Sequence, residues 1–221
     1  MRKRTITTNG SGLLDKVDGI TILDHLIENH FDHLNISKTH YDETVNKKIM
    51  CYKKGYCSNE DLKEIVPYAL SHNLRPRLSC LLLKSGISTI DDMANYIEYY
   101  EKLGVDNVIF RQLMDYDEQN MCNAEKMNYC KENKVDLNEV WKQVDQDNRF
   151  QRYKNILGYY YYVEIYNYHN VVVCSESADL KIPYQEKEKN PDVVYEMVFH
   201  PNGNLNGSWV DNEDILLEYQ D

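Results

Sequence analysis

In the middle of the chain, short apolar segments alternate with an amphipathic one. Residues 75–83 and 106–113 are each predicted to form a strand. The segment between them begins at Ser88, with Asp91 in the capping position, and ends at Gly104, which is typical of a helix. Strands joined by a helix in this way form right-handed βαβ units of a parallel sheet.

The same alternation is predicted on the N-terminal side of this unit. The expected elements are strands at 4–8 and 33–37 and helices at 20–30, 41–52 and from Ser58 onward, with Asp61 in the capping position. Four parallel strands are too few to close a barrel of eight. We therefore expect an α/β protein in which residues 1–115 form a partial (β/α) barrel with parallel strands.

The pattern changes after residue 115. The expected elements are helices at 123–132 and 137–146, strands at 159–166 and 171–175 around Tyr168-His169-Asn170, and strands at 193–200 and 205–210 around Pro201-Asn202-Gly203. Strands joined by tight turns pair antiparallel. Residues 116–221 are thus predicted to form a C-terminal extension of helices and antiparallel β-strands.

Charge and cysteine content limit the partners and the location. The net charge of -11 disfavours a nucleic-acid partner, because an acidic surface repels phosphate backbones. The basic start, Met1 to Arg4, is not followed by an apolar run, so neither a signal peptide nor a membrane partner is expected. The six cysteines include no Cys-x-x-Cys pair, which favours reduced thiols and a cytoplasmic location.

Several short motifs occur at or near the predicted strands in a recognisable order. They are Thr7-Thr8-Asn9-Gly10, Ser37, Arg77 with Ser79, and Leu103-Gly104-Val105-Asp106. In this order they resemble strands three to six of the barrel in the radical S-adenosylmethionine (radical SAM) superfamily. His200-Pro201-Asn202-Gly203 and Ser208-Trp209 resemble a C-terminal hairpin of some members.

The resemblance implies that the chain binds S-adenosylmethionine (SAM) and takes part in forming a 5′-deoxyadenosyl radical. The implied cofactor-binding residues are Thr8, Asn9, Gly10, Ser37, Arg77 and Ser79. Arg77 would pair with the carboxylate of SAM, and Ser37 would contact its ribose or carboxylate. Arg111, late in the last parallel strand, is the candidate for binding an acidic substrate, and no catalytic residue is assigned.

The chain departs from the superfamily at its defining motif. No Cys-x3-Cys-x2-Cys loop is present, and three thiolates at fixed geometry are needed to hold a [4Fe–4S] cluster. We expect a cluster only if a missing N-terminal half supplies the cysteines, and we expect this chain alone to be inactive. That half, or a second copy, is the expected partner, bound at the open edge of strand 4–8.

Each candidate residue also has a structural interpretation. Arg77 could be a surface charge, Ser79 a core hydroxyl, and Asn9-Gly10 a simple turn. Arg111 could pair with Asp115. The four N-terminal histidines, His25, His30, His33 and His40, are expected to be polar surface residues, with no metal site.

Two other functions compete with the enzyme hypothesis. The chain could be a non-catalytic interaction or regulatory module that retains half of the fold. It could also be an unrelated barrel enzyme with a Schiff-base lysine or a metal site at the strand ends. Lys38 and Lys84 are the lysines nearest to those ends.

Overall fold

The protein is described by a computed structural model that covers residues 3–52, 55–113, 124–157, 162–176, 188–194, 197–208 and 212–218. Its contacts divide the chain into two compact units. Unit 1 comprises Met1–Gly158 and Tyr162–Ala178, and unit 2 comprises Tyr159–Tyr161 and Asp179–Asp221.

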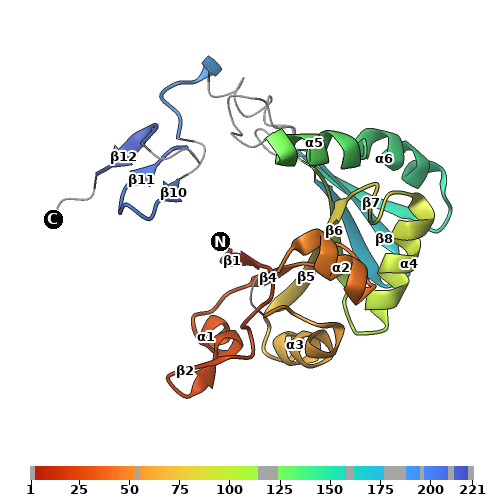
Figure 1. The fold of residues 1–221 in the computed structure, drawn as a ribbon, viewed down its shortest axis with the longest axis horizontal. Helices are drawn as coiled ribbons and strands as arrows, with labels where there is room; N and C mark the ends of the chain where they lie inside the picture. Colours follow the sequence, from red (N-terminus) through yellow and green to blue (C-terminus); the bar gives the residue numbers. More distant parts are fainter. Residues whose placement is uncertain are drawn as a thin grey trace. The chain divides into compact units, whose positions relative to one another are not determined.

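Unit 1 is built on a seven-stranded, mostly parallel sheet (Figure 1). In spatial order its strands are β1 (Thr5–Thr8), β4 (His33–Ser37), β5 (Arg75–Leu82), β6 (Asn107–Gln112), β9 (Val171–Glu176), β8 (Tyr162–Tyr168) and β7 (Gln151–Leu157). The first five are mutually parallel, whereas β8 and β7 are antiparallel to their neighbours. A small hairpin, β2 (Lys16–Val17) with β3 (Ile20–Thr21), precedes the first helix.

Four helices cover one face of this sheet, namely α1 (Ile22–Glu28), α3 (Asn59–Ser71), α4 (Ile90–Glu101) and α6 (Leu137–Gln146). Two further described helices are α2 (Glu43–Met50) and α5 (Ala124–Asn133). Figure 1 shows α1, α3, α4 and α6 following one another around the outer side of the sheet. Every second strand residue, such as Ile36, Leu78 and Phe110, is fully buried in the core with apolar residues of the helices. The face opposite these helices is called the polar face below.

The helix starts follow from capping boxes. Ser58 and Asp61 form the box predicted for α3. The box of α4 lies one residue later than predicted, because Thr89 and Asp92 have the same spacing as Ser88 and Asp91 and form the reciprocal bonds. These boxes fix where the chain turns from each strand back along the sheet.

The four expected parallel strands are present, and the chain is of mixed α/β class. The described strands form an open sheet with β1 and β7 at its edges, not a closed barrel. The antiparallel strands β8 and β9, expected in the extension, continue the central sheet because β9 pairs parallel with β6. Strand β7 was not predicted. The strand expected at 159–166 corresponds to β8, and residues 159–161 of that prediction lie outside the described part.

Unit 2 contains a three-stranded antiparallel sheet of β10 (Val198–Phe199), β11 (Leu205–Asn206) and β12 (Ile215–Leu217). The predicted turn at Pro201-Asn202-Gly203 joins β10 to β11, and the Gly203 amide donates to the His200 carbonyl at 2.9 Å. Within the described ranges of the whole chain, no helix has the length and apolar character needed to cross a membrane.

Candidate functional site

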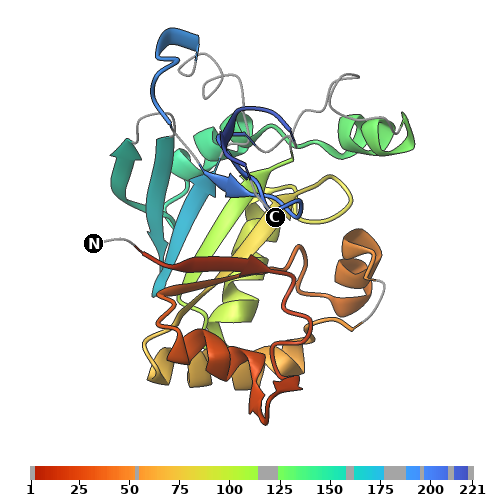
Figure 2. The same ribbon diagram turned by 90° about the vertical axis from the view of Figure 1, so that its left-hand side faces the viewer.

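A row of polar side chains crosses the polar face of the sheet. Thr7, Asn35 and Arg77 are direct cross-strand partners on β1, β4 and β5. Asn107 continues this row on β6, because its neighbour Val108 pairs with Leu78, the neighbour of Arg77. Adjacent strands are about 4.8 Å apart, so these side chains are neighbours. Figure 2 shows the strands that carry this polar row running side by side.

The polar row contains buried atoms without hydrogen-bond partners. Asn35 is only 6% exposed, and its Nδ2 donates to Thr7 Oγ1 at 3.2 Å. Among the described residues, nothing bonds to Asn35 Oδ1, Arg77 Nε or Asn107 Oδ1, although all three atoms are buried. An unsatisfied buried polar group costs about 1–3 kcal/mol. Three of them in one row indicate a place where a ligand or ordered water completes the bonds.

Two hydroxyl groups lie beside the polar row, two residues nearer the C-terminal ends of the strands. Ser37 on β4 and Ser79 on β5 are direct cross-strand partners and face the same side as Asn35 and Arg77. Ser79 is 7% exposed. Within the described part of the chain neither hydroxyl has a hydrogen-bond partner. The site thus offers a guanidinium, two amide oxygens and two hydroxyls to a ligand.

The chain is firmly held where it leaves β4. The Tyr96 hydroxyl on α4 donates to the Lys38 carbonyl at 2.6 Å. Buried Asn46 on α2 accepts bonds at its Oδ1 from Thr39 N, at 2.9 Å, from Thr39 Oγ1, at 3.1 Å, and from His40 N, at 3.3 Å. These bonds limit the motion of the end of β4, which carries the Ser37 hydroxyl.

Lys38 itself is fully buried on the helix side. Its ammonium donates to the Cys57 carbonyl at 2.7 Å, and no carboxylate in the described ranges lies within ion-pair distance of it. Desolvation lowers the pKa of Lys38, and the nearby Cys57 and Glu43 oppose this effect. Lys38 lies on the helix side, away from the polar face, so it is not among the residues that the polar row brings together.

The buried amine gives a prediction about pH. Since the pKa of Lys38 in the folded chain lies below its ordinary value of 10.5, the unfolded chain binds more protons between the two values. The stability of the parent should therefore rise with pH across that window, by about 1.4 kcal/mol for each tenfold change in proton affinity. Lys38→Met lacks this titrating group. Its free energy of unfolding relative to that of the parent should therefore fall as the pH rises from neutral towards 10.5.

This is measured by urea unfolding of both proteins across the pH range. Lys48→Met, at an exposed position of the neighbouring helix α2, controls for loss of a lysine charge. If the free energies of unfolding of the parent and of Lys38→Met differ by the same amount at every pH, the pKa of the buried amine is not lowered by folding.

The predicted contacts at the end of β1 take part in a local turn. Thr8 Oγ1 accepts from Gly10 N at 3.0 Å, and Asn9 Oδ1 accepts from Ser11 N at 3.0 Å and from Ser11 Oγ at 2.7 Å. Gly10 is buried, with a φ of +80°. These oxygens are already used as acceptors, and the turn explains the motif without a ligand.

Arg111 faces the same side of the sheet as the polar row, farther along β6. Its cross-strand neighbours are Leu81 on β5 and Glu176 on β9. Asp115, its alternative ion-pair partner, lies outside the described residues. The structure therefore brings Arg111 to the face that carries Ser37 and Arg77.

The described cysteines do not form a cluster-binding set. No group of three His, Cys, Asp or Glu side chains in the described ranges could hold a metal ion. Burial raises the pKa of Cys57 to about 11 and that of Cys80 well above its usual value, which opposes the thiolate form that iron needs. Of the four N-terminal histidines, His25 contacts the Val17 carbonyl and His40 accepts from the Asp42 amide.

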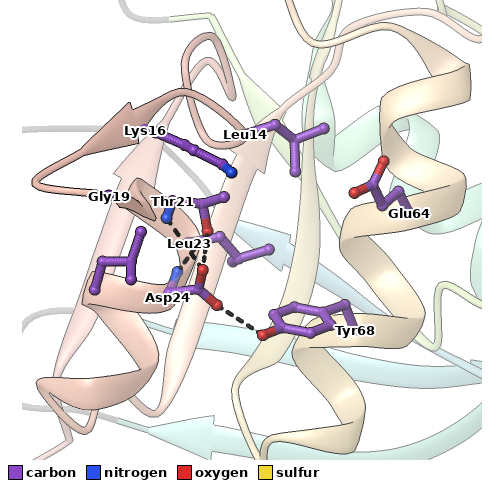
Figure 3. A pocket seen from close by; sticks show the side chains of 9 residues that line it. Leu14, Lys16, Gly19, Thr21, Leu23, Asp24, Glu64 and Tyr68 are labelled. Atoms are coloured by element: carbon purple, nitrogen blue, oxygen red, sulfur yellow. Dashed lines mark hydrogen bonds between the residues drawn. The ribbon is translucent and has the colours of Figure 1, made fainter.

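A separate hollow of about 310 Å³ lies between the β2–β3 hairpin, α1 and α3 (Figure 3). At its centre, Asp24 accepts from the Tyr68 hydroxyl at 2.7 Å and from Thr21 in the capping box of α1. Figure 3 shows both oxygens of this carboxylate in use. The hollow is therefore explained by helix capping and adds no candidate site.

Comparison with models of protein families and with curated proteins gives no match. The site therefore stands on its geometry and on the sequence resemblance alone. Sequence reasoning named Ser37, Arg77 and Ser79 but missed Asn35 and Asn107. The available signal was strand alternation, because residues two apart in a strand share a face.

Proposed function

We propose that this chain is the C-terminal portion of a radical-SAM-like enzyme and that it binds S-adenosylmethionine on the polar face. The parallel strands β1, β4, β5 and β6 would be part of a (β/α) barrel, and the polar face would line its interior. The observation that carries the proposal is the set of unsatisfied polar atoms at Asn35, Arg77 and Asn107 beside two unbonded hydroxyls.

The residues present suit the functional groups of this cofactor. The Arg77 guanidinium would bind the carboxylate, and the amide oxygens of Asn35 and Asn107 would accept from the ammonium. The hydroxyls of Ser37 and Ser79 would bond to the ribose. In complete enzymes of this kind, S-adenosylmethionine supplies a 5′-deoxyadenosyl radical that abstracts hydrogen from a substrate. Arg111 would bind an acidic substrate on the same face.

No reductive step is assigned to the described part of this chain, because its cysteines do not suit a [4Fe–4S] cluster. The three thiolates would come from residues outside that part, as in a separate N-terminal half. The described chain alone is expected to be inactive. The free thiols of all five described cysteines support a reducing, cytoplasmic location.

Calorimetric titration with S-adenosylmethionine tests the proposal. Arg77→Ala should weaken binding about tenfold to a hundredfold, because a bond to a charged group contributes about 1.5–3 kcal/mol. Ser37→Ala should weaken it up to about tenfold, because a neutral hydrogen bond contributes about 0.5–1.5 kcal/mol.

Two variants on the helical side serve as controls. Lys63→Ala removes an exposed charge from α3, and Ser71→Ala removes an exposed hydroxyl from the same helix. Neither should change the affinity. The proposal fails if the parent does not bind at millimolar cofactor, or if it binds and neither Arg77→Ala nor Ser37→Ala weakens it.

A non-catalytic interaction module remains the second candidate. The observation that favours it is strand β1, which has a single neighbour among the described strands and carries Thr and Ile rather than charged side chains along Thr5–Thr8. An edge of this kind favours pairing with another strand, from a second copy or from a separate N-terminal half. Association measured by light scattering, without cofactor binding, would favour this alternative.

A further inference from the structure

A group of basic side chains lies at the N-terminal end of the strands on the polar face. His33 on β4 and Arg75 on β5 are direct cross-strand partners, one step nearer the strand N-termini than Asn35 and Arg77. Residues two apart on a strand are about 6.8 Å apart and share a face, so both arginines and the imidazole point to one side. Lys3, two residues before β1, adds a further charge that acts on His33.

These cations are not neutralised by the described chain. Neither Arg75 nor Arg77 has an ion pair among the described residues, and Arg77 Nε is buried without any partner. Asp32 is the one described carboxylate that acts on His33, and its Oδ2 already accepts from the Arg4 amide at 2.8 Å. The group is unexpected in a chain with a net charge of -11.

We propose that His33, Arg75 and Arg77, with Lys3, form a binding site for a small molecule that carries a phosphate group. A phosphate has nearly two negative charges and three acceptor oxygens, whereas a carboxylate has one charge and two oxygens. Two guanidinium groups with an imidazole match the phosphate better, because each guanidinium can donate two parallel bonds. A bound dianion would also relieve the repulsion between these like charges.

The electrostatics of His33 support the site. Desolvation lowers the pKa of His33, and the charges of Arg77, Lys3 and Arg75 lower it further, against a smaller opposite effect of Asp32. This positive field disfavours the protonated imidazole in the empty protein. A bound phosphate would reverse the sign of the field and raise the pKa of His33. Phosphate binding should therefore be accompanied by proton uptake at His33 between its pKa in the empty protein and its higher pKa in the occupied protein.

This inference goes beyond cofactor binding and does not rest on it. The two sites share Arg77 but differ in their other residues. Arg75→Ala should impair phosphate binding alone, and Ser37→Ala should impair S-adenosylmethionine binding alone. The failure of one proposal is then separate from the failure of the other.

Calorimetric titration of the whole chain with inorganic phosphate and with pyrophosphate at low salt tests the proposal, with acetate as the carboxylate comparison. Arg75→Ala and Arg77→Ala should each weaken phosphate binding at least about tenfold, whereas Lys63→Ala and Ser37→Ala should leave it unchanged. In the parent, NMR titration of the His33 imidazole should show a pKa that rises when phosphate is added.

Three results would overturn the proposal. The first is a parent that does not bind millimolar phosphate. The second is phosphate affinity that is the same in the parent and in both arginine variants. The third is binding of acetate as tight as that of phosphate, which would show a carboxylate site. Circular dichroism of each variant confirms that the folded proteins are being compared.

Discussion

Gly10→Ala should destabilise the protein by about 3 kcal/mol, because it combines a left-handed backbone with overpacking. The φ of Gly10 is +80°, a region that costs an L-residue about 1–2 kcal/mol. A Cβ there would lie 2.6 Å from Cys57 Cβ and 3.1 Å from Ile36 Cγ2, both in the buried core. Overpacking of this kind costs about 1–3 kcal/mol more.

Urea unfolding measures this loss, and Gly19→Ala separates its two causes. Gly19 has a φ of +93°, but a Cβ at this position would meet nothing within 4 Å. Gly19→Ala should therefore show the backbone cost alone, about 1–2 kcal/mol. Equal losses for the two variants would mean that the turn after β1 can move away from Cys57 without cost, and that the close packing there is not stabilising.

The alternation of strands and helices in the first half could be predicted, because each element has its own apolar pattern and end signals in the sequence. The expected strand at 33–37 coincides with β4, and the expected strand at 75–83 with β5, which ends at Leu82. Both contain buried apolar residues at every second position, and the helices that follow them begin at the N-cap residues Asp42 and Thr89. Local propensity and tertiary burial agree in these elements.

Strand β7 could not be predicted in the same way. Its first four residues, Gln151 to Lys154, are all exposed, so the apolar alternation that marks a strand is absent. It forms through pairing with β8 at the edge of the sheet. The parallel pairing of β6 with β9 was missed for a related reason, since no local feature shows which distant strand completes a sheet edge.

The site was predicted only in part, because its residues are brought together by strand register. Asn35, Arg77 and Asn107 are far apart in the sequence, and a shift of one residue would have placed them on the helix side. His33 was expected to be a polar surface residue; it is partly exposed at the start of β4, and its pairing with Arg75 had no signal in the sequence. The burial of Lys38 had no local signal, because lysine at a strand end is usually exposed.

Asn46→Ala should cost about 3 kcal/mol of stability, because it leaves three donors after β4 without an acceptor. Asn46 is 1% exposed, and its single side-chain oxygen accepts from Thr39 N, Thr39 Oγ1 and His40 N. Thr39 is also buried, which hinders water from replacing its two bonds. The loss should be largest in this segment, and the amides of Thr39 and His40 should exchange hydrogen faster.

Chemical unfolding gives the total loss, and hydrogen exchange gives its location. Asn133→Ala is the control, because the partly exposed Asn133 side chain makes one bond among the described residues, to a carbonyl of its own helix, and its loss should cost less than about 0.5 kcal/mol. If Asn46→Ala unfolds like the parent and Thr39 and His40 stay protected, the strand end that positions Ser37 is held by other contacts, and the anchoring assigned to α2 is wrong.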